Sequence, residues 1–221
     1  VGLCLLTGGS LHGEQSFGRY GVNASLATLA SIVVLTLVLP NYTTTVPGPV
    51  YSASQLAFVA AVSLILYGIF VFVQTVRHRD YFLPPASAEN LEHAPVPSNK
   101  TALVSATLLM ACLGAVVLLA KATSPFVESV VKSAGAPSTL VGVIIAATVL
   151  LPEAVAAFRA ARTNRLQTSL NLALGSALAT IGLTIPAVAI VSLVTGWTLT
   201  LGIDAKSTVL LLLTLLVATL S

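Results

Sequence analysis

Long apolar runs separated by short polar turns constrain this chain more than any other feature of its sequence. A helix of about 20 apolar residues crosses a hydrocarbon core of about 30 Å. Five runs approach or exceed that length, at residues 22–39, 53–76, 101–120, 139–158 and 168–194, and a sixth begins near Thr208. Because a backbone in lipid must satisfy its own hydrogen bonds, such runs form helices. The sequence predicts an all-α, multi-pass transmembrane helical bundle.

The composition agrees with a membrane protein and excludes an ordinary soluble domain. Hydrophobic residues make up 56% of the chain and charged residues 8%, whereas a soluble domain has about 25% charged residues. Membrane lipid is therefore the expected surrounding. The net charge of +3 comes from few groups, and its basic residues gather in the turns, which indicates membrane orientation and no nucleic-acid partner.

The basic residues also predict an orientation. If the turn before the first run is cytoplasmic and the runs alternate, seven basic residues fall inside and three outside. The inside group is Arg19, Arg77, Arg79, Lys100, Arg159, Arg162 and Arg165, and the outside group is Lys121, Lys132 and Lys206. This count follows the positive-inside rule. We therefore expect a cell inner membrane protein whose loop 77–100 and Arg159–Arg165 turn are cytoplasmic.

The runs divide the chain into segments. Residues 1–10 look like the end of a truncated transmembrane helix, which Gly8, Gly9 and Ser10 would stop. The other expected segments are two helices at 22–76, a proline-rich linker at 77–100, and a second half at 101–221 with a helical hairpin at 139–194 and a truncated last helix. We expect a piece of a longer transporter-like protein. Glu89, Glu92 and His93 could hold a metal weakly, but a solvated loop is the better interpretation.

The hairpin holds the most informative residues, Pro152 and Glu153. A carboxylate inside an apolar helix costs roughly 2.5 kcal/mol or more to insert into lipid. Proline cannot donate a backbone hydrogen bond, so we expect the helix to kink or break near Leu151, at Pro152. The freed carbonyls beside Glu153 would form an oxygen-rich pocket, and oxygen is the ligand that calcium prefers. The alternative is that Glu153 is a helix-end acid reaching interfacial water.

The second helix of the hairpin is predicted to supply the facing wall. Asn171, Gly175, Ala179 and Gly182 follow one helical stripe, whose small residues let helix backbones approach closely. A side-chain amide such as that of Asn171 in an apolar run needs a partner. We predict Asn171 and Ser176 as further metal ligands and Gly175 as a packing residue. The alternative for Ser176 is ordinary helix packing, because small and hydroxyl residues are common between membrane helices.

These residues favour transport. A buried carboxylate can bind either a proton or a cation, since burial raises its proton affinity and a nearby divalent cation lowers it. The predicted function is secondary active exchange of Ca²⁺, or Na⁺ or K⁺, for H⁺, with Glu153 binding each in turn. No cofactor beyond these ions is expected, and a second acid must come from elsewhere. The alternative is a non-transporting scaffold or sensor; an enzyme is not expected, since no catalytic constellation lies within the runs.

One stretch also resembles a known family. The run VGVIIAATVLLPEAVAAFRAARTNRLQTSLNLALGSALATIGLTIPAV resembles the second alpha-repeat of the cation/calcium exchanger superfamily, and in particular of bacterial calcium/proton antiporters. The stretches GVNASLATLASIVVLTLVLPNYTTTVPGP and QTVRHRDYF are similar to the same subgroup. The resemblance implies two inverted halves with a midplane ion site formed by discontinuous helices.

That resemblance also assigns roles. It places Glu153 at the ion-binding glutamate of the repeat. It places Asn171 and Ser176 in the second helix of the repeat, where relatives line the same site with small polar residues. It further implies that the first alpha-repeat, with its own glutamate, precedes Val1, so that this chain is an incomplete exchanger fold.

Overall fold

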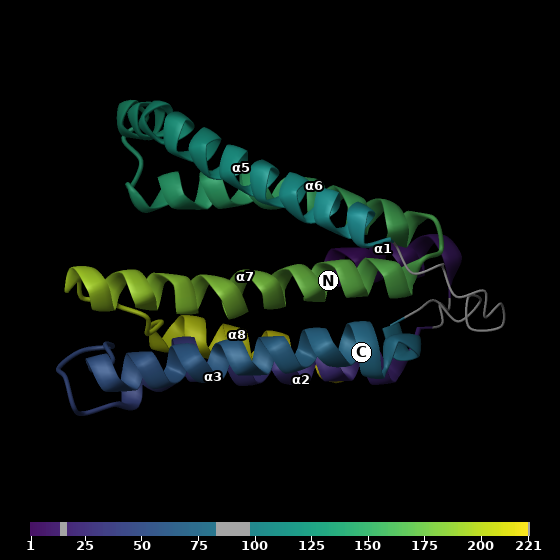
Figure 1. Ribbon diagram of the computed structural model, residues 1–221, viewed down its shortest axis with the longest axis horizontal. Coiled ribbons are helices and arrows are strands. Elements are labelled where there is room, and N and C mark those ends of the chain that lie inside the picture. The colour runs from purple at the N-terminus through teal and green to yellow at the C-terminus, as the bar shows by residue number, and fades with distance from the viewer. Residues whose placement is uncertain (14–16, 83–97, 221) are drawn as a thin grey trace. The chain divides into compact units, whose positions relative to one another are not determined.

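The computed structural model describes residues 1–13, 17–82 and 98–220. Five of the described helices are long and apolar enough to cross a membrane, as the sequence predicts. They span Arg19–Tyr42, Ala53–Arg77, Asn99–Ser133, Thr139–Arg162 and Leu166–Thr195. The protein is therefore a multi-pass helical membrane protein (Figure 1).

The helices carry several changes of winding. The elements in chain order are α1 (Gly2–His12), α2 (Arg19–Val33), the π-helix η1 (Val34–Val38), the 3-10 helix η2 (Leu39–Tyr42), α3 (Ala53–Phe72), the π-helix η3 (Val73–Arg77), the 3-10 helix η4 (Arg79–Phe82), α5 (Asn99–Ser133), α6 (Thr139–Arg162), α7 (Leu166–Thr195) and α8 (Ala205–Leu220). The winding changes sit at the ends of the first two spans, where each enters a loop.

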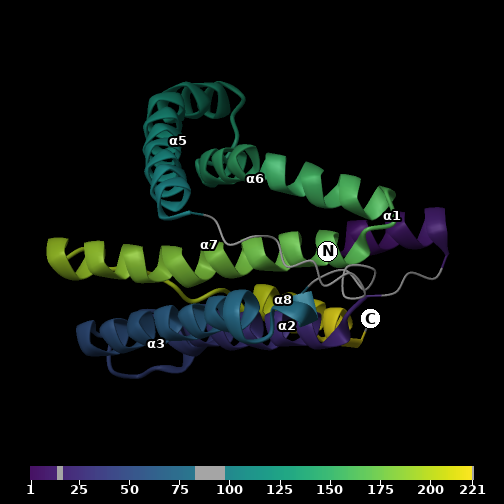
Figure 2. The same ribbon diagram turned by 45° about the vertical axis from the view of Figure 1, so that its right-hand side comes forward.

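The chain forms two compact units, described separately here. The first comprises residues 1–90 and 155–221, and the second comprises residues 91–154. In the first unit α3 packs along α7, and α2 also packs on α7, as the lengthwise arrangement of the three helices in Figures 1 and 2 shows. Their shared core contains Ile32, Leu170 and Leu178, which are fully buried.

Hydrogen bonds tie the two ends of the first unit. At one end the Gly18 amide at the start of α2 donates to Gln167 Oε1 on α7. At the other end Asn41 Nδ2 donates to the Ile203 carbonyl at 2.7 Å, and the Leu201 amide to the Pro49 carbonyl at 3.2 Å. Spans α2 and α7 therefore run in the same direction and α3 runs in the opposite one, as the predicted alternation of successive spans requires.

Local sequence signals explain where the helices begin and end. Ser52 and Gln55 form a reciprocal capping box at the start of α3, in which the Ser52 amide donates to Gln55 Oε1 at 3.0 Å. Such a cap satisfies amides that have no helical partner. The Ser98 hydroxyl accepts from the Thr101 amide at 3.2 Å and starts α5 in the same way. Gly196 ends α7 with a φ of 70°, a left-handed conformation that glycine adopts without steric cost.

Asp204 caps the start of α8. Its carboxylate accepts hydrogen bonds from the Ser207 hydroxyl and, at 3.4 Å, from the Ser207 amide. The Ser207 side chain, chiefly, holds the pKa of Asp204 below its ordinary value. Because hydrogen bonds to the ionised form lower a pKa, this cap is present above the ordinary Asp pKa and is lost as pH falls through the depressed one.

The second unit contains α5 and residues 139–154 of α6. Helix α5 continues to Ser133, beyond the apolar run at 101–120, with Pro125 inside it. Lys132 Nζ lies 2.7 Å from Glu128 Oε1 in the i, i+4 ion pair that the spacing predicts. In the most apolar 18-residue window of α5 no residue is buried. The described residues therefore leave the apolar surface of α5 uncovered.

The helix stop predicted at Gly8, Gly9 and Ser10 and the break predicted at Pro152 are not found, and a kink at Pro152 stays a prediction. Helix α1 runs past Gly8 and Gly9 to His12, and α6 runs through Pro152 without the predicted break. Likewise α7 continues through Pro186 to Thr195. A membrane helix tolerates these residues, because each proline frees only one backbone carbonyl, and neighbouring groups and small local adjustments can supply a donor to it. The proposed metal-binding residues at 89–93 and most of the predicted linker lie outside the described residues.

Close packing between α3 and α7 occurs at Gly182, on the stripe of small residues that the sequence predicts. A Cβ added at Gly182 would lie 3.0 Å from both Cβ and Cγ of Tyr67 on α3. A Cβ added at Gly175 would meet nothing within 4 Å. The packing role predicted for Gly175 stays a prediction, because no described residue meets it, whereas Gly182 packs closely against Tyr67.

A substitution tests this contact. We expect Gly182→Leu to lower the free energy of unfolding by about 1–3 kcal/mol, because the new side chain must displace Tyr67 in a packed interface. Denaturant titration of the purified protein in detergent micelles measures the change. The matched control is Gly175→Leu on the same helix, which we expect to alter the free energy of unfolding much less. Equal losses from the two variants would contradict the assignment.

Candidate functional site

Glu153 lies well inside the apolar part of α6. At 1.5 Å per residue, it is about 9 Å along the helix axis from Arg159, the first basic residue that follows it. Its side chain is exposed on the described chain. A carboxylate at such a depth is rare in membrane helices and is found facing a protein interior or a water-filled cavity. Glu153 is thus the group of α6 with the strongest functional signal.

Pro152 leaves one backbone carbonyl of α6 without its usual helical donor, although the helix is continuous. Because proline has no backbone N–H, the Thr148 carbonyl lacks the donor that an α-helix would give it. The Thr148 hydroxyl is engaged elsewhere, since it donates to the Ile144 carbonyl at 2.8 Å. Thr148 lies about 1.4 helical turns before Glu153, and the oxygen-rich pocket expected beside Glu153 stays a prediction.

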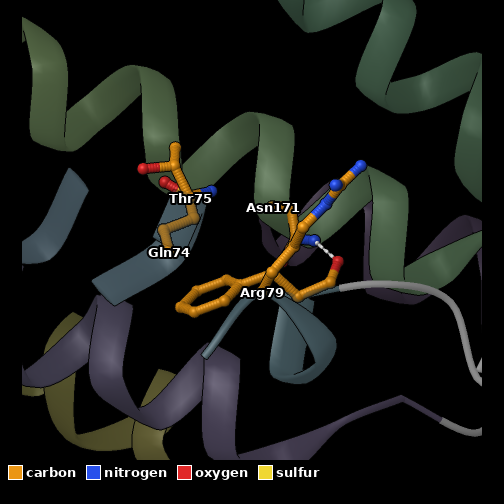
Figure 3. Close-up of a pocket in the computed structure, with 5 residues that line it drawn as sticks. Gln74, Thr75, Arg79 and Asn171 are labelled. Carbon is orange, nitrogen blue, oxygen red and sulfur yellow. Dashed lines mark hydrogen bonds between the residues drawn. The ribbon is translucent and has the colours of Figure 1, made fainter. Parts of the chain in front are cut away.

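Asn171, the amide predicted as a ligand, is half-buried and has protein partners at both ends of its side chain. Its Nδ2 donates to the Phe82 carbonyl at the end of η4, the contact drawn as a dashed line in Figure 3. Its Oδ1 accepts from Gln167 Nε2 at 3.1 Å. The partner that this amide requires is therefore found within the first unit, and one lone pair of Oδ1 is left for another donor or ion.

Gln167 is a residue that the sequence reasoning missed. It is 2% exposed, and it bridges the Gly18 amide, whose nitrogen lies 2.6 Å from Oε1, to Asn171. The result is a chain of amides that joins the start of α2, the first turns of α7 and the end of η4. The signal was present in the sequence, because Gln167 and Asn171 are four residues apart and Gln–Asn pairs at that spacing interact on a helix.

The remaining predicted residues occupy separate places. Ser176 is half-buried on α7. Since it is five residues from Asn171, it points about 140° away around the helix at 3.6 residues per turn, and the structure does not bring these two side chains to one side of α7. Glu153 belongs to the second unit, whereas Asn171, Gly175 and Ser176 belong to the first.

No cluster of ligands typical of a resident metal is found in the described ranges, where no three His, Cys, Asp or Glu residues lie together. Cys4 is buried, Cys112 is exposed, and both are free thiols. The described chemistry is thus that of a carboxylate in the apolar part of α6 together with a separate polar network at one end of the first unit.

Comparison with known proteins identifies the family. Residues 104–221 match the family described as sodium/calcium exchanger protein. This match covers more than half of the chain and includes Glu153 and all of α6 and α7. The chain belongs to the sodium/calcium exchanger protein family.

Two bacterial relatives align with the whole of this exchanger-family chain. The y4hA protein of Sinorhizobium fredii (strain NBRC 101917 / NGR234), named as an ionic transporter, is 46% identical over 228 residues. The sodium-potassium/proton antiporter ChaA of Escherichia coli (strain K12) is 31% identical over 224 residues. The chain spans 60% of the length of each of these relatives. The predicted resemblance to the exchanger superfamily is therefore confirmed.

Proposed function

We propose that the full-length protein is a secondary antiporter that exchanges Ca²⁺, Na⁺ or K⁺ for H⁺, with Glu153 binding the cation and the proton in turn. The observation that carries the proposal is an acid within the apolar part of α6, inside the segment that matches the exchanger family. The name of the Escherichia coli relative supports proton-coupled exchange of monovalent cations by that protein.

The exposure of Glu153 supports this role on energetic grounds. If the ionised carboxylate faced lipid, its insertion would cost roughly 2.5 kcal/mol or more. An acid that is exposed on this chain at that depth is stable when it faces water, a bound cation, or protein beyond the described residues. We infer that Glu153 borders a route by which ions and water reach the membrane interior.

Oxygen ligands around Glu153 are proposed as follows. The Thr148 carbonyl, which Pro152 deprives of its helical donor, lies near Glu153 along α6. The resemblance alone implies further ligands from α7, namely Asn171 Oδ1 and the Ser176 hydroxyl, and we keep both as proposals although their side chains lie about 140° apart around that helix. Calcium takes 6–8 oxygen ligands, so a second carboxylate from elsewhere in the full-length protein completes the proposed charge balance.

The coupling follows from competition at one group. A protonated Glu153 is neutral and attracts a cation weakly, whereas an ionised Glu153 binds one and is then less able to take a proton. Exchange results if the site opens to one side of the membrane in its protonated form and to the other side in its cation-bound form. No covalent step and no cofactor are needed.

We also propose a location and orientation for the protein. Bacterial relatives and apolar spans support a multi-pass protein of the cell inner membrane. The end of the first unit that holds Arg19, Arg79 and Arg165 is proposed to be cytoplasmic, in keeping with the positive-inside rule. The linker 77–100 and the turn at 159–165 lie at that end in this proposal.

The experiment is a flux measurement in everted membrane vesicles that contain the full-length protein. Respiration acidifies the vesicle interior, and a pH-sensitive dye reports the gradient after addition of Ca²⁺, Na⁺ or K⁺ in turn. We expect at least one of these cations to dissipate the gradient in vesicles with the protein and not in vesicles without it. If none does so, proton-coupled exchange of these cations is rejected.

A further inference from the structure

An open pocket of about 490 Å³ lies at the end of α3 in the first unit. Its lining comes from η3, η4 and α7, as Figure 3 shows. The residues that line it are Gln74, Thr75, Arg79, Phe82 and Asn171. This pocket is large enough for a small ligand. Asn171 is the one lining residue that also has a part in the proposed cation exchange, where its Oδ1 is a proposed ligand.

The charge of the lining favours an anion. Arg79 is the one charged residue among the residues that line the pocket. Within the described residues, no carboxylate lies within ion-pair distance of its guanidinium, and the single ion pair found there joins Lys132 to Glu128. Asp80, next in sequence, is exposed and does not line the pocket. Arg79 therefore presents to the pocket a positive charge that no carboxylate of the described residues neutralises.

The hydrogen-bonding groups of the pocket point to the same ligand class. Asn171 Oδ1 carries partial negative charge that would repel an anion, but this charge is partly offset because the oxygen accepts a hydrogen bond from Gln167. Asn171 Nδ2 uses one of its two N–H groups on the Phe82 carbonyl, which leaves the other. The amide of Gln74 adds two more donors. The lining thus offers several N–H donors beside a guanidinium.

The backbone that carries these residues departs from regular α-helix. Gln74 and Thr75 lie in the π-helix η3, and Arg79 begins the 3-10 helix η4 directly after it. Single-turn π-helices are costly and occur frequently at functional sites. The changed winding displaces Gln74 and Thr75 from the line that the α3 helix would otherwise give them.

From this geometry we propose that the pocket binds a phosphate group. Arginine matches phosphate because its planar fork donates two parallel hydrogen bonds. The pocket lies at the end of a membrane span, where the phosphates of lipid headgroups are found, and basic pockets at such helix ends bind anionic headgroups. The same chemistry would accept a soluble phosphate, and the experiment distinguishes the two sources.

The test is isothermal titration calorimetry on the full-length protein in a neutral detergent. The probes are short-chain phosphatidylglycerol below its micelle concentration, short-chain phosphatidylcholine, and inorganic phosphate. The test variant is Arg79→Gln, and the matched control is Arg77→Gln, which removes an equal charge from an exposed neighbour that does not line the pocket. Gln74→Leu is a second test variant that leaves the net charge unchanged.

We expect saturable binding of phosphatidylglycerol or of inorganic phosphate, weakened at least tenfold by Arg79→Gln and measurably by Gln74→Leu, and preserved in Arg77→Gln. Tighter binding of phosphatidylglycerol than of inorganic phosphate identifies the lipid as the source, and the reverse order identifies soluble phosphate. Absence of saturable binding overturns the proposal, as does an equal loss in the Arg77 and Arg79 variants. The readout is binding, so it is independent of the proposed exchange activity.

Discussion

Replacement of Glu153 by glutamine is expected to abolish cation-dependent dissipation of a pH gradient in vesicles that contain the full-length protein. The amide has nearly the same shape as the carboxyl group, but it neither takes up nor releases a proton near neutral pH, and it cannot neutralise a cation. Both halves of the proposed exchange cycle would stop. The expected rate is that of vesicles without the protein.

The control for this variant is chosen from the same chain. Glu128→Gln makes the same chemical change at an exposed acid whose partner, Lys132, lies one turn away on α5. Exposed ion pairs of this kind contribute about 0–1 kcal/mol, so normal amounts of protein and normal flux are expected. Flux that persists in the Glu153 variant at the wild-type rate would remove this residue from the mechanism and favour a scaffold or sensor role.

Replacement of Gln167 by leucine is expected to lower the free energy of unfolding by roughly 2–4 kcal/mol. Leucine fills a similar volume, but it leaves the Gly18 amide without its acceptor and Asn171 Oδ1 without its donor. Each buried polar group that loses its partner costs about 1–3 kcal/mol. Denaturant titration in detergent micelles measures the loss, which should appear as a lower midpoint.

Thr168→Val provides the matched control for that measurement. Thr168 is adjacent to Gln167 in the first turn of α7, and its side chain is exposed. We expect its replacement to change the free energy of unfolding by less than about 0.5 kcal/mol, as is usual for surface positions. If Gln167→Leu were as mild as this control, the amide chain would not hold α2, α7 and η4 together.

The spans were predictable because their signal is local. A run such as 53–76 is recognised as a membrane span from its apolar length alone. Contacts with residues far away in sequence are not needed for this prediction. The odd acid at 153 is equally visible, since its cost in lipid depends on its own chemistry and that of its neighbours. The resemblance of the hairpin to the exchanger superfamily followed from the same stretch, and the family match confirms it.

The helix interruptions were not predictable, for a physical reason. Proline at 152 or 186 removes one donor wherever it stands, but whether the helix continues depends on what surrounds that turn. In α6 and α7 the helix continues. Likewise a glycine by itself shows only that a neighbouring residue can approach the helix closely. At Gly182 that neighbour is Tyr67, which lies more than a hundred positions away in sequence.

The sequence by itself determined a helical membrane protein of the exchanger family with an acid, Glu153, inside the apolar run at 139–158, because length, hydropathy and charge are properties of short segments. The tertiary structure decided that Asn171 bonds to Gln167 and Phe82, and that Arg79 faces a pocket beside them. Such pairings join residues from different helices. They are fixed by how the α2, α3 and α7 helices pack, which no single segment encodes.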